Sequence, residues 1–149
     1  MRFMSPNSPL AARIATAGRI LLGVALLAAG TGHLTFARST FQAQVPAWVP
    51  LDPDVVVVAS GIVEILLGVG LIIPWRFHRQ MGLVTALFFI AIFPGNIAQF
   101  VEHTDAFGLT SDIARGIRLL FQPVLVLWAL WCTSALSLFS RTVTGRMRN

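Results

Sequence analysis

The sequence predicts an all-α fold, a bundle of four transmembrane helices. Of the 149 residues, 56% are hydrophobic and only 11% are charged, whereas soluble domains carry about 25% charged residues. The mean hydropathy is +0.77. Four apolar segments are each long enough to cross a hydrocarbon core of about 30 Å as a helix. These segments are 20–36, 55–73, 82–101 and 119–138. We therefore predict one transmembrane domain at 13–140, a flexible tail at 1–12 and a basic cytoplasmic tail at 141–149.

The first segment has a second interpretation. Arg13 and Arg19 precede the apolar run, and small residues at 28–30 follow it, which is also the pattern of a cleaved signal peptide. The apolar character nevertheless continues through His33 to Phe36. Removal of this segment would also leave three spans, with the two termini on opposite sides. Both observations favour a retained helix.

The short link at 74–79 predicts that the second and third segments form an antiparallel hairpin.

Arginines predict the orientation of the bundle. All eleven basic residues are arginine, and only Arg38, Arg115 and Arg118 fall on the side opposite the termini. The positive-inside rule therefore places both termini in the cytoplasm, in a multi-pass protein of a bacterial-type plasma (inner) membrane.

The basic pI of about 11.6 then reflects the arginines that set the orientation, which lie close to anionic lipid headgroups. Nucleic acid is excluded as a partner, because no soluble basic face with interleaved aromatic residues is present. The lone Cys132 excludes an intrachain disulfide and a dithiol redox centre, and is interpreted as a packing residue.

Glu64 is the most informative residue of the chain. It lies nine residues, or about 13 Å, inside the second apolar segment, where a carboxylate costs roughly 3 kcal/mol. Gly61 and Gly68 share its helix face at spacings of three and four. Because small residues let helices approach closely in lipid, Glu64 is predicted to face a helix interface. Its role is either functional or that of a structural, protonated carboxyl bonded to another helix.

Other polar side chains converge on the external half of the predicted bundle. His33 lies near the outer end of the first segment, and Asn96, Gln99 and His103 share one face of the third. Arg118 and Gln122 are four residues apart near the outer end of the fourth segment. Pro94 leaves the carbonyl of Ile90 without its helical donor, which is tolerated where a helix lines a cavity.

Each of these residues also has a purely structural interpretation. His33 is then an interfacial histidine, Asn96 fixes a helix, and Arg118 pairs with Glu102 or Asp112. A metal held by His33, Glu64 and His103 is a further alternative, but spacing alone does not make a metal site, and we predict none.

Four motifs together resemble the DoxX-like family of small four-helix membrane proteins. They are GTGHLTF at 30–36, VPAWVP at 45–50, SGIVEILLG at 60–68 and FPGNI at 93–97. The resemblance implies a four-helix membrane fold over about 18–135 and places the recurring polar positions of the family on His33, Glu64 and Asn96. The chain departs from the family at Leu34, where an aromatic residue is usual.

The wider DoxX/DoxD group includes a membrane subunit associated with a thiosulfate:quinone oxidoreductase and members linked to redox-stress responses. A more distant animal relative is a receptor-assembly chaperone. The resemblance therefore implies that this chain is a membrane subunit with an oxidoreductase partner. The chain would not be catalytic on its own.

Three functions follow from these observations. The first is a redox-associated subunit that binds a quinone or a similar small amphiphile in an outer-leaflet polar pocket. In it, Glu64 exchanges a proton, because burial disfavours its charged form. The second is a membrane assembly scaffold, and the third is a small proton-coupled carrier, which would need to form a homo-oligomer. The predicted ligand contacts are His33, Glu64, Asn96 and Gln99. The predicted supporting residues are Gly61, Pro94, Arg118 and Gln122.

Overall fold

The computed structural model describes residues 8–105, 108 and 111–138. Within them the chain is helical and contains no β-strand. The helices are α1 (Pro9–Leu34), α2 (Arg38–Gln42), α3 (Pro53–Ile72), α4 (His78–Val101) and α5 (Asp112–Cys132). All but α2 are long and apolar enough to cross a membrane. The all-α, four-span prediction is confirmed, and the chain is an integral membrane protein.

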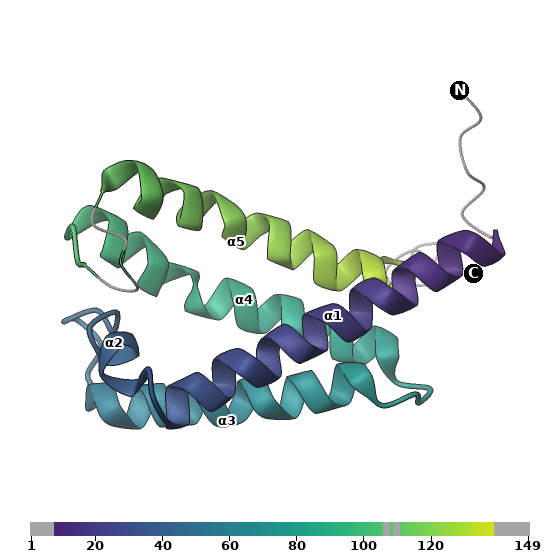
Figure 1. Cartoon of the computed structure of the whole chain (residues 1–149), viewed down its shortest axis with the longest axis horizontal. Helices are drawn as coiled ribbons and strands as arrows, with labels where there is room; N and C mark the ends of the chain where they lie inside the picture. The colour runs from purple at the N-terminus through teal and green to yellow at the C-terminus, as the bar shows by residue number, and fades with distance from the viewer. Residues whose placement is uncertain (1–7, 106–107, 109–110, 139–149) are drawn as a thin grey trace, which may run out of the picture.

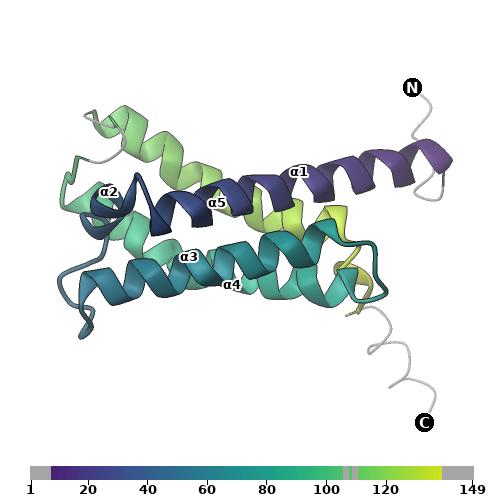
Figure 2. The same ribbon diagram turned by 60° about the horizontal axis from the view of Figure 1, so that its bottom comes forward.

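The four long helices form two pairs. α1 packs along α3 and α4 packs along α5, whereas contacts between the two pairs are far fewer. The pairs converge at the end where residues 73–77 link α3 to α4, and they diverge at the end that holds α2 (Figures 1 and 2). We call these the turn end and the α2 end. α3 and α4 are joined by a short link and run antiparallel, as predicted, but they diverge toward the α2 end and pack mainly on α1 and α5.

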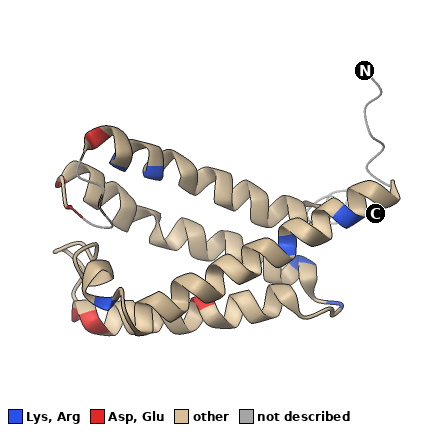
Figure 3. Ribbon diagram, viewed as in Figure 1, with Lys and Arg blue, Asp and Glu red and all other residues tan. Residues whose placement is uncertain are grey.

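The described chain begins and ends at the turn end, as four spans require (Figure 1). Charged residues gather toward the two ends of the bundle, with long uncharged stretches between them (Figure 3). The cytoplasmic location of the turn end stays a prediction from the arginine distribution. The predicted basic tail at 141–149 lies outside the described residues.

Several helix boundaries differ from those of the predicted segments, and two of the differences have a clear local cause. α1 begins at Pro9, inside the predicted tail, because the Ser8 hydroxyl accepts a hydrogen bond from the Ala11 amide at 3.2 Å and proline is favourable at the first helical position. α5 ends at Cys132, six residues before the predicted end of the fourth segment. Ser134 there has a positive φ of 55°, which does not continue a right-handed helix.

The apolar core lies toward the turn end. Leu71 and Ala129 are fully buried, and Arg19 is buried beside them with its guanidinium donating to the Leu71 carbonyl at the end of α3. A cation is favourable there because the last carbonyls of a helix lack internal donors. Arg19, one of the arginines that predicts the orientation, is thus an interior residue rather than a headgroup contact. The buried core cluster comprises Leu22, Leu26, Leu67, Leu71, Ala86, Phe89, Ala129 and Cys132.

Glycines set the close approach of α1 and α3. A Cβ atom at Gly30 would lie 2.6 Å from the Gly61 carbonyl oxygen, and one at Gly61 would lie 2.7 Å from the His33 Cβ. Gly68 meets the backbone of Gly23 in the same way. This confirms the prediction that the face of α3 carrying Glu64 packs in a tight helix interface.

We expect Gly30→Ala to destabilise the fold, because the added methyl forces α1 away from the α3 backbone. Overpacking of this kind typically costs about 1–3 kcal/mol. The thermal unfolding midpoint in mild detergent measures the effect. Gly116→Ala is the matched control, since a Cβ there meets only Phe100 at 3.5 Å. An equal midpoint for both variants would contradict the predicted backbone contact.

Candidate functional site

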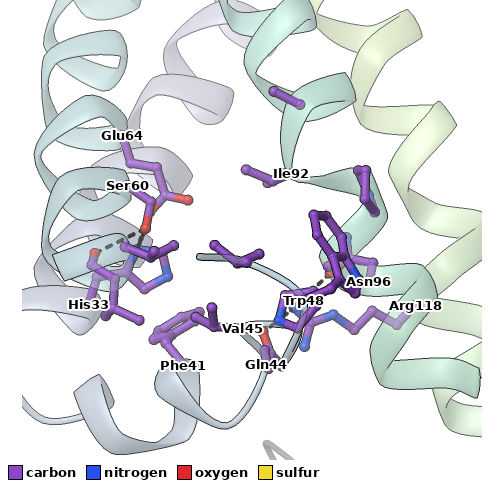
Figure 4. A pocket seen from close by; sticks show the side chains of 17 residues that line it. His33, Phe41, Gln44, Val45, Trp48, Ser60, Glu64, Ile92, Asn96 and Arg118 are labelled. Atoms are coloured by element: carbon purple, nitrogen blue, oxygen red, sulfur yellow. Dashed lines mark hydrogen bonds and ion pairs between the residues drawn. The ribbon is translucent and has the colours of Figure 1, made fainter. Parts of the chain in front are cut away.

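A cavity of about 220 Å³ lies at the α2 end, where the two helix pairs diverge. Its walls come from α1, α3, α4 and α5, and from residues 43–52, which we call the crossing loop (Figure 4). The polar residues in its lining are His33, Gln44, Ser60, Glu64, Asn96 and Arg118.

The Glu64 carboxyl forms the centre of the α1–α3 wall. Its side chain is only 8% exposed, and its Oε2 atom lies 3.2 Å from Nδ1 of His33. No hydrogen bond of suitable geometry reaches this Oε2 atom, although it is buried. Glu64 lines the cavity, and its Oε2 atom, buried beside His33, is left unsatisfied, a rare condition that calls for an explanation.

His33 is held in place from three sides. Its Nδ1 atom lies 3.3 Å from the Ser60 hydroxyl oxygen, and that hydroxyl donates to the Val57 carbonyl at 3.0 Å. Because the single Ser60 proton is used there, the arrangement favours a proton on Nδ1 of His33. The Phe41 ring meets the imidazole edge-on, with centroids 3.5 Å apart. His33 is therefore oriented toward both Ser60 and Glu64.

The α4–α5 wall carries a chain of amides that ends at Arg118. The Asn96 amide donates to Oε1 of Gln122 at 2.9 Å, and the Gln122 amide donates to the Phe89 carbonyl at 2.7 Å. This carbonyl is adjacent to that of Ile90, which Pro94 leaves without a donor. Arg118 donates to Oδ1 of Asn96 at 3.4 Å. The position of Asn96 in the cavity is thus fixed by Gln122 behind the wall and by Arg118 in the wall beside it.

Figure 4 shows that these polar groups stand on opposite walls. Glu64, Ser60 and His33 lie on one side, and Asn96 and Arg118 lie on the other. Apolar side chains, including Val45 and Ile92, lie between them. The cavity can therefore hold a molecule that is apolar in its middle and polar at both ends.

The crossing loop joins the two helix pairs through Gln44. Its Nε2 donates to Oε1 of Gln99 at 3.2 Å, and its Oε1 accepts from Arg118 at 2.9 Å. At the other side, Arg38 of α2 donates twice to the Asp54 carboxylate, and these bonds raise the pKa of the Arg38 guanidinium. The crossing loop is thus attached to α4 and α5 through Gln44, and α2 before it is attached to α3 through Arg38.

Five of the eight predicted residues line the cavity: the ligand contacts His33, Glu64 and Asn96, and the supporting residues Pro94 and Arg118. The other predicted residues lie behind its walls. Gln99, predicted as a ligand contact, is 3% exposed, is absent from the cavity lining and bonds Gln44 and the Thr104 carbonyl instead. Gln122 and Gly61 support the walls through Asn96 and His33.

Two of the alternatives drawn from sequence are wrong. His103 is exposed and pairs with Asp112 at 2.8 Å, so it does not join His33 and Glu64. Across the residues with described placement, no group of three or more His, Cys, Asp or Glu side chains is placed to hold a metal ion. Asp112 pairs with Arg115, and Arg118 donates to Gln44 and Asn96.

Sequence reasoning missed Gln44 and Ser60 as cavity residues. Ser60 stands four residues before Glu64 on the same helix face, which is a usable signal. Gln44 belongs to an irregular segment, where no periodicity indicates which helices a side chain reaches.

One protein family, described as Domain of unknown function (DUF8561), matches residues 22–133. The chain belongs to the DUF8561 family. The match extends from the middle of α1 to the end of α5 and therefore includes every residue that lines the cavity. No curated protein and no solved structure matches the chain.

Proposed function

We propose that this DUF8561 chain is a redox-associated membrane subunit that binds a quinone or a similar small amphiphile in the cavity at the α2 end. The observation that carries the proposal is that Glu64 lines the cavity while its Oε2 atom, buried beside His33, has no hydrogen-bond partner. A buried polar atom left in this state costs about 1–3 kcal/mol. A ligand group that bonds Glu64 would remove that cost.

The shape of the polar lining supports a quinone-like ligand. A para-quinone is a flat apolar ring with oxygen atoms at opposite ends, and the cavity has hydrogen-bonding groups on opposite walls. A protonated Glu64, held beside His33, would donate to one oxygen, and Arg118 would donate to the other. The four motifs that resemble DoxX-like proteins agree with this assignment, and they suggest that a partner oxidoreductase in the same membrane supplies the electrons.

An assembly scaffold is the second candidate, favoured by one observation. Three large apolar side chains at the α2 end, Phe36, Trp48 and Leu51, are each more than half exposed. Such residues suit contact with another membrane protein. A carrier has weaker support, because the cavity lies at the α2 end and the buried core cluster fills the turn end.

The proposal is tested by filling the cavity. Ile92 lines it, so Ile92→Trp is expected to remove the bound amphiphile that mass spectrometry detects in extracts of the purified protein. Leu87→Trp is the matched control, because Leu87 lies on the same helix and is exposed. Retention of the same amphiphile by Ile92→Trp protein with an unchanged elution profile would refute binding in this cavity.

If extracts of both the unsubstituted and the control protein contain no bound amphiphile, the scaffold function is favoured. In that case, substitutions in the crossing loop such as Trp48→Ala are expected to abolish co-purification of a partner. Unchanged partner recovery would exclude the scaffold through this surface.

A further inference from the structure

A shallow groove runs along α4 beside the cavity. It is lined by Trp48, Pro94, Ile97, Ala98, Val101 and Glu102. Ile97 and Val101 are exposed apolar residues on a membrane-spanning helix, so this face of α4 contacts lipid. The stretch from Pro94 to Glu102 is eight residues, or about 12 Å of helix. The groove therefore leads from the membrane boundary at the α2 end to the depth of Pro94.

The groove and the cavity meet at Trp48 and Pro94, which belong to both linings. Pro94 is fixed in α4. Trp48 lies on the crossing loop, is 66% exposed and stands between the two hollows. Its side chain is therefore the movable part of the boundary between them.

The backbone around Trp48 is held, but its indole is not. The Val49 amide donates to the Pro46 carbonyl at 3.0 Å, and Pro46 is buried. Trp75 and Trp128 each donate their indole N–H to a backbone carbonyl, at 2.9 and 3.1 Å. Among the described residues no hydrogen-bond partner is found for the Trp48 indole. Rotation of this side chain thus breaks no hydrogen bond.

The water-facing side of the cavity is covered differently. Gln44 ties the crossing loop to α4 and α5, and Val45 and Pro46 lie over the cavity. Displacement of the crossing loop would break the Gln44 bonds to Gln99 and Arg118. Entrance from the groove requires only a rotation of the Trp48 side chain.

We propose that the ligand reaches the cavity sideways from the lipid, along the α4 groove and past Trp48. The site therefore takes a membrane-dissolved amphiphile rather than a water-soluble compound. This inference rests on the proposed function, because it concerns the ligand of the same cavity.

The test uses decylubiquinone, a quinone with a short apolar tail, and protein immobilised in mild detergent. Uptake and release of the quinone are followed with time, and Kd is measured at equilibrium. Ile97→Phe narrows the groove but does not touch the cavity, so both rates are expected to fall severalfold and by the same factor, with Kd unchanged. Trp48→Ala opens the boundary, and both rates are expected to rise. Leu87→Phe, on a lipid-facing part of α4 outside both linings, should change neither.

The outcomes separate the two proposals. Saturable binding with rates that are the same in Ile97→Phe and Leu87→Phe overturns the route and leaves the proposed ligand in place. Absence of saturable decylubiquinone binding to the unsubstituted protein overturns the proposed quinone ligand and the route together. Faster release with unchanged uptake in Trp48→Ala, and therefore a weaker Kd, would make Trp48 a ligand contact and not a gate.

Discussion

Glu64→Met is expected to stabilise the ligand-free protein and to abolish ligand binding. The Oε2 atom of Glu64 is buried without a hydrogen-bond partner, and replacement of such a group by an apolar side chain of similar size removes its desolvation cost. We expect a gain of roughly 1–3 kcal/mol in the free energy of unfolding. The thermal midpoint in detergent and the content of bound amphiphile measure the two effects.

A purely structural carboxyl gives the opposite result. If Glu64 stabilises the fold by bonding another helix, Glu64→Met lowers the thermal midpoint, because a partner is then left unsatisfied. Glu64→Gln is the companion variant, since it keeps the shape and the hydrogen-bonding capacity but loses the ionisable group. A lower midpoint for Glu64→Met, combined with undiminished ligand in Glu64→Gln, would end the ligand proposal for this residue.

Arg118→Met is expected to weaken ligand binding and to loosen the crossing loop. Arg118 donates to Gln44 at 2.9 Å and to Asn96 at 3.4 Å, and it lines the cavity. Hydrogen bonds to a charged group are worth about 1.5–3 kcal/mol, which corresponds to roughly 10–150-fold in Kd. Equilibrium binding of decylubiquinone measures the affinity, and limited proteolysis measures the accessibility of residues 43–52.

Arg115→Met separates this effect from a general loss of charge at the α2 end. Arg115 is as buried as His33 and Glu64, but it pairs with Asp105 and Asp112 and does not line the cavity. We expect its substitution to leave Kd and the crossing loop nearly unchanged. An equal loss of affinity in both variants would show that Arg118 acts through the fold and not at the site.

The spans and the interior position of Glu64 could be predicted from sequence, because lipid imposes a strong pattern on both. A span needs about twenty apolar residues, and a carboxyl in such a span is tolerated in the interior, beside glycines that admit a second helix. Gly61 and Glu64 share a face of α3, and that face is the one packed on α1.

The pairing of helices could not be predicted in the same way. In lipid the apolar residues of a helix do not distinguish a neighbouring helix from an acyl chain. The short link at 74–79 therefore predicted that the second and third segments run antiparallel, but not that α1 packs on α3 and α4 on α5. Gln99 and Gln122 were correctly expected in the polar cluster, but whether an amide lines a cavity or supports its wall depends on the crossing loop. The loop position is set by Gln44, whose partners are 55 and 74 residues away in the chain.

The pairing has a mechanical consequence. α1 with α3 and α4 with α5 are two helical hairpins, and residues 73–77 are the covalent link between them. A ligand that bonds Glu64 on one hairpin and Arg118 on the other binds best at one separation of the two hairpins. Ligand binding and the angle between the hairpins are then thermodynamically linked: each biases the other by the same free energy. Occupancy of a small cavity would in this way be transmitted along the full length of the bundle, to the side of the membrane where no ligand is bound.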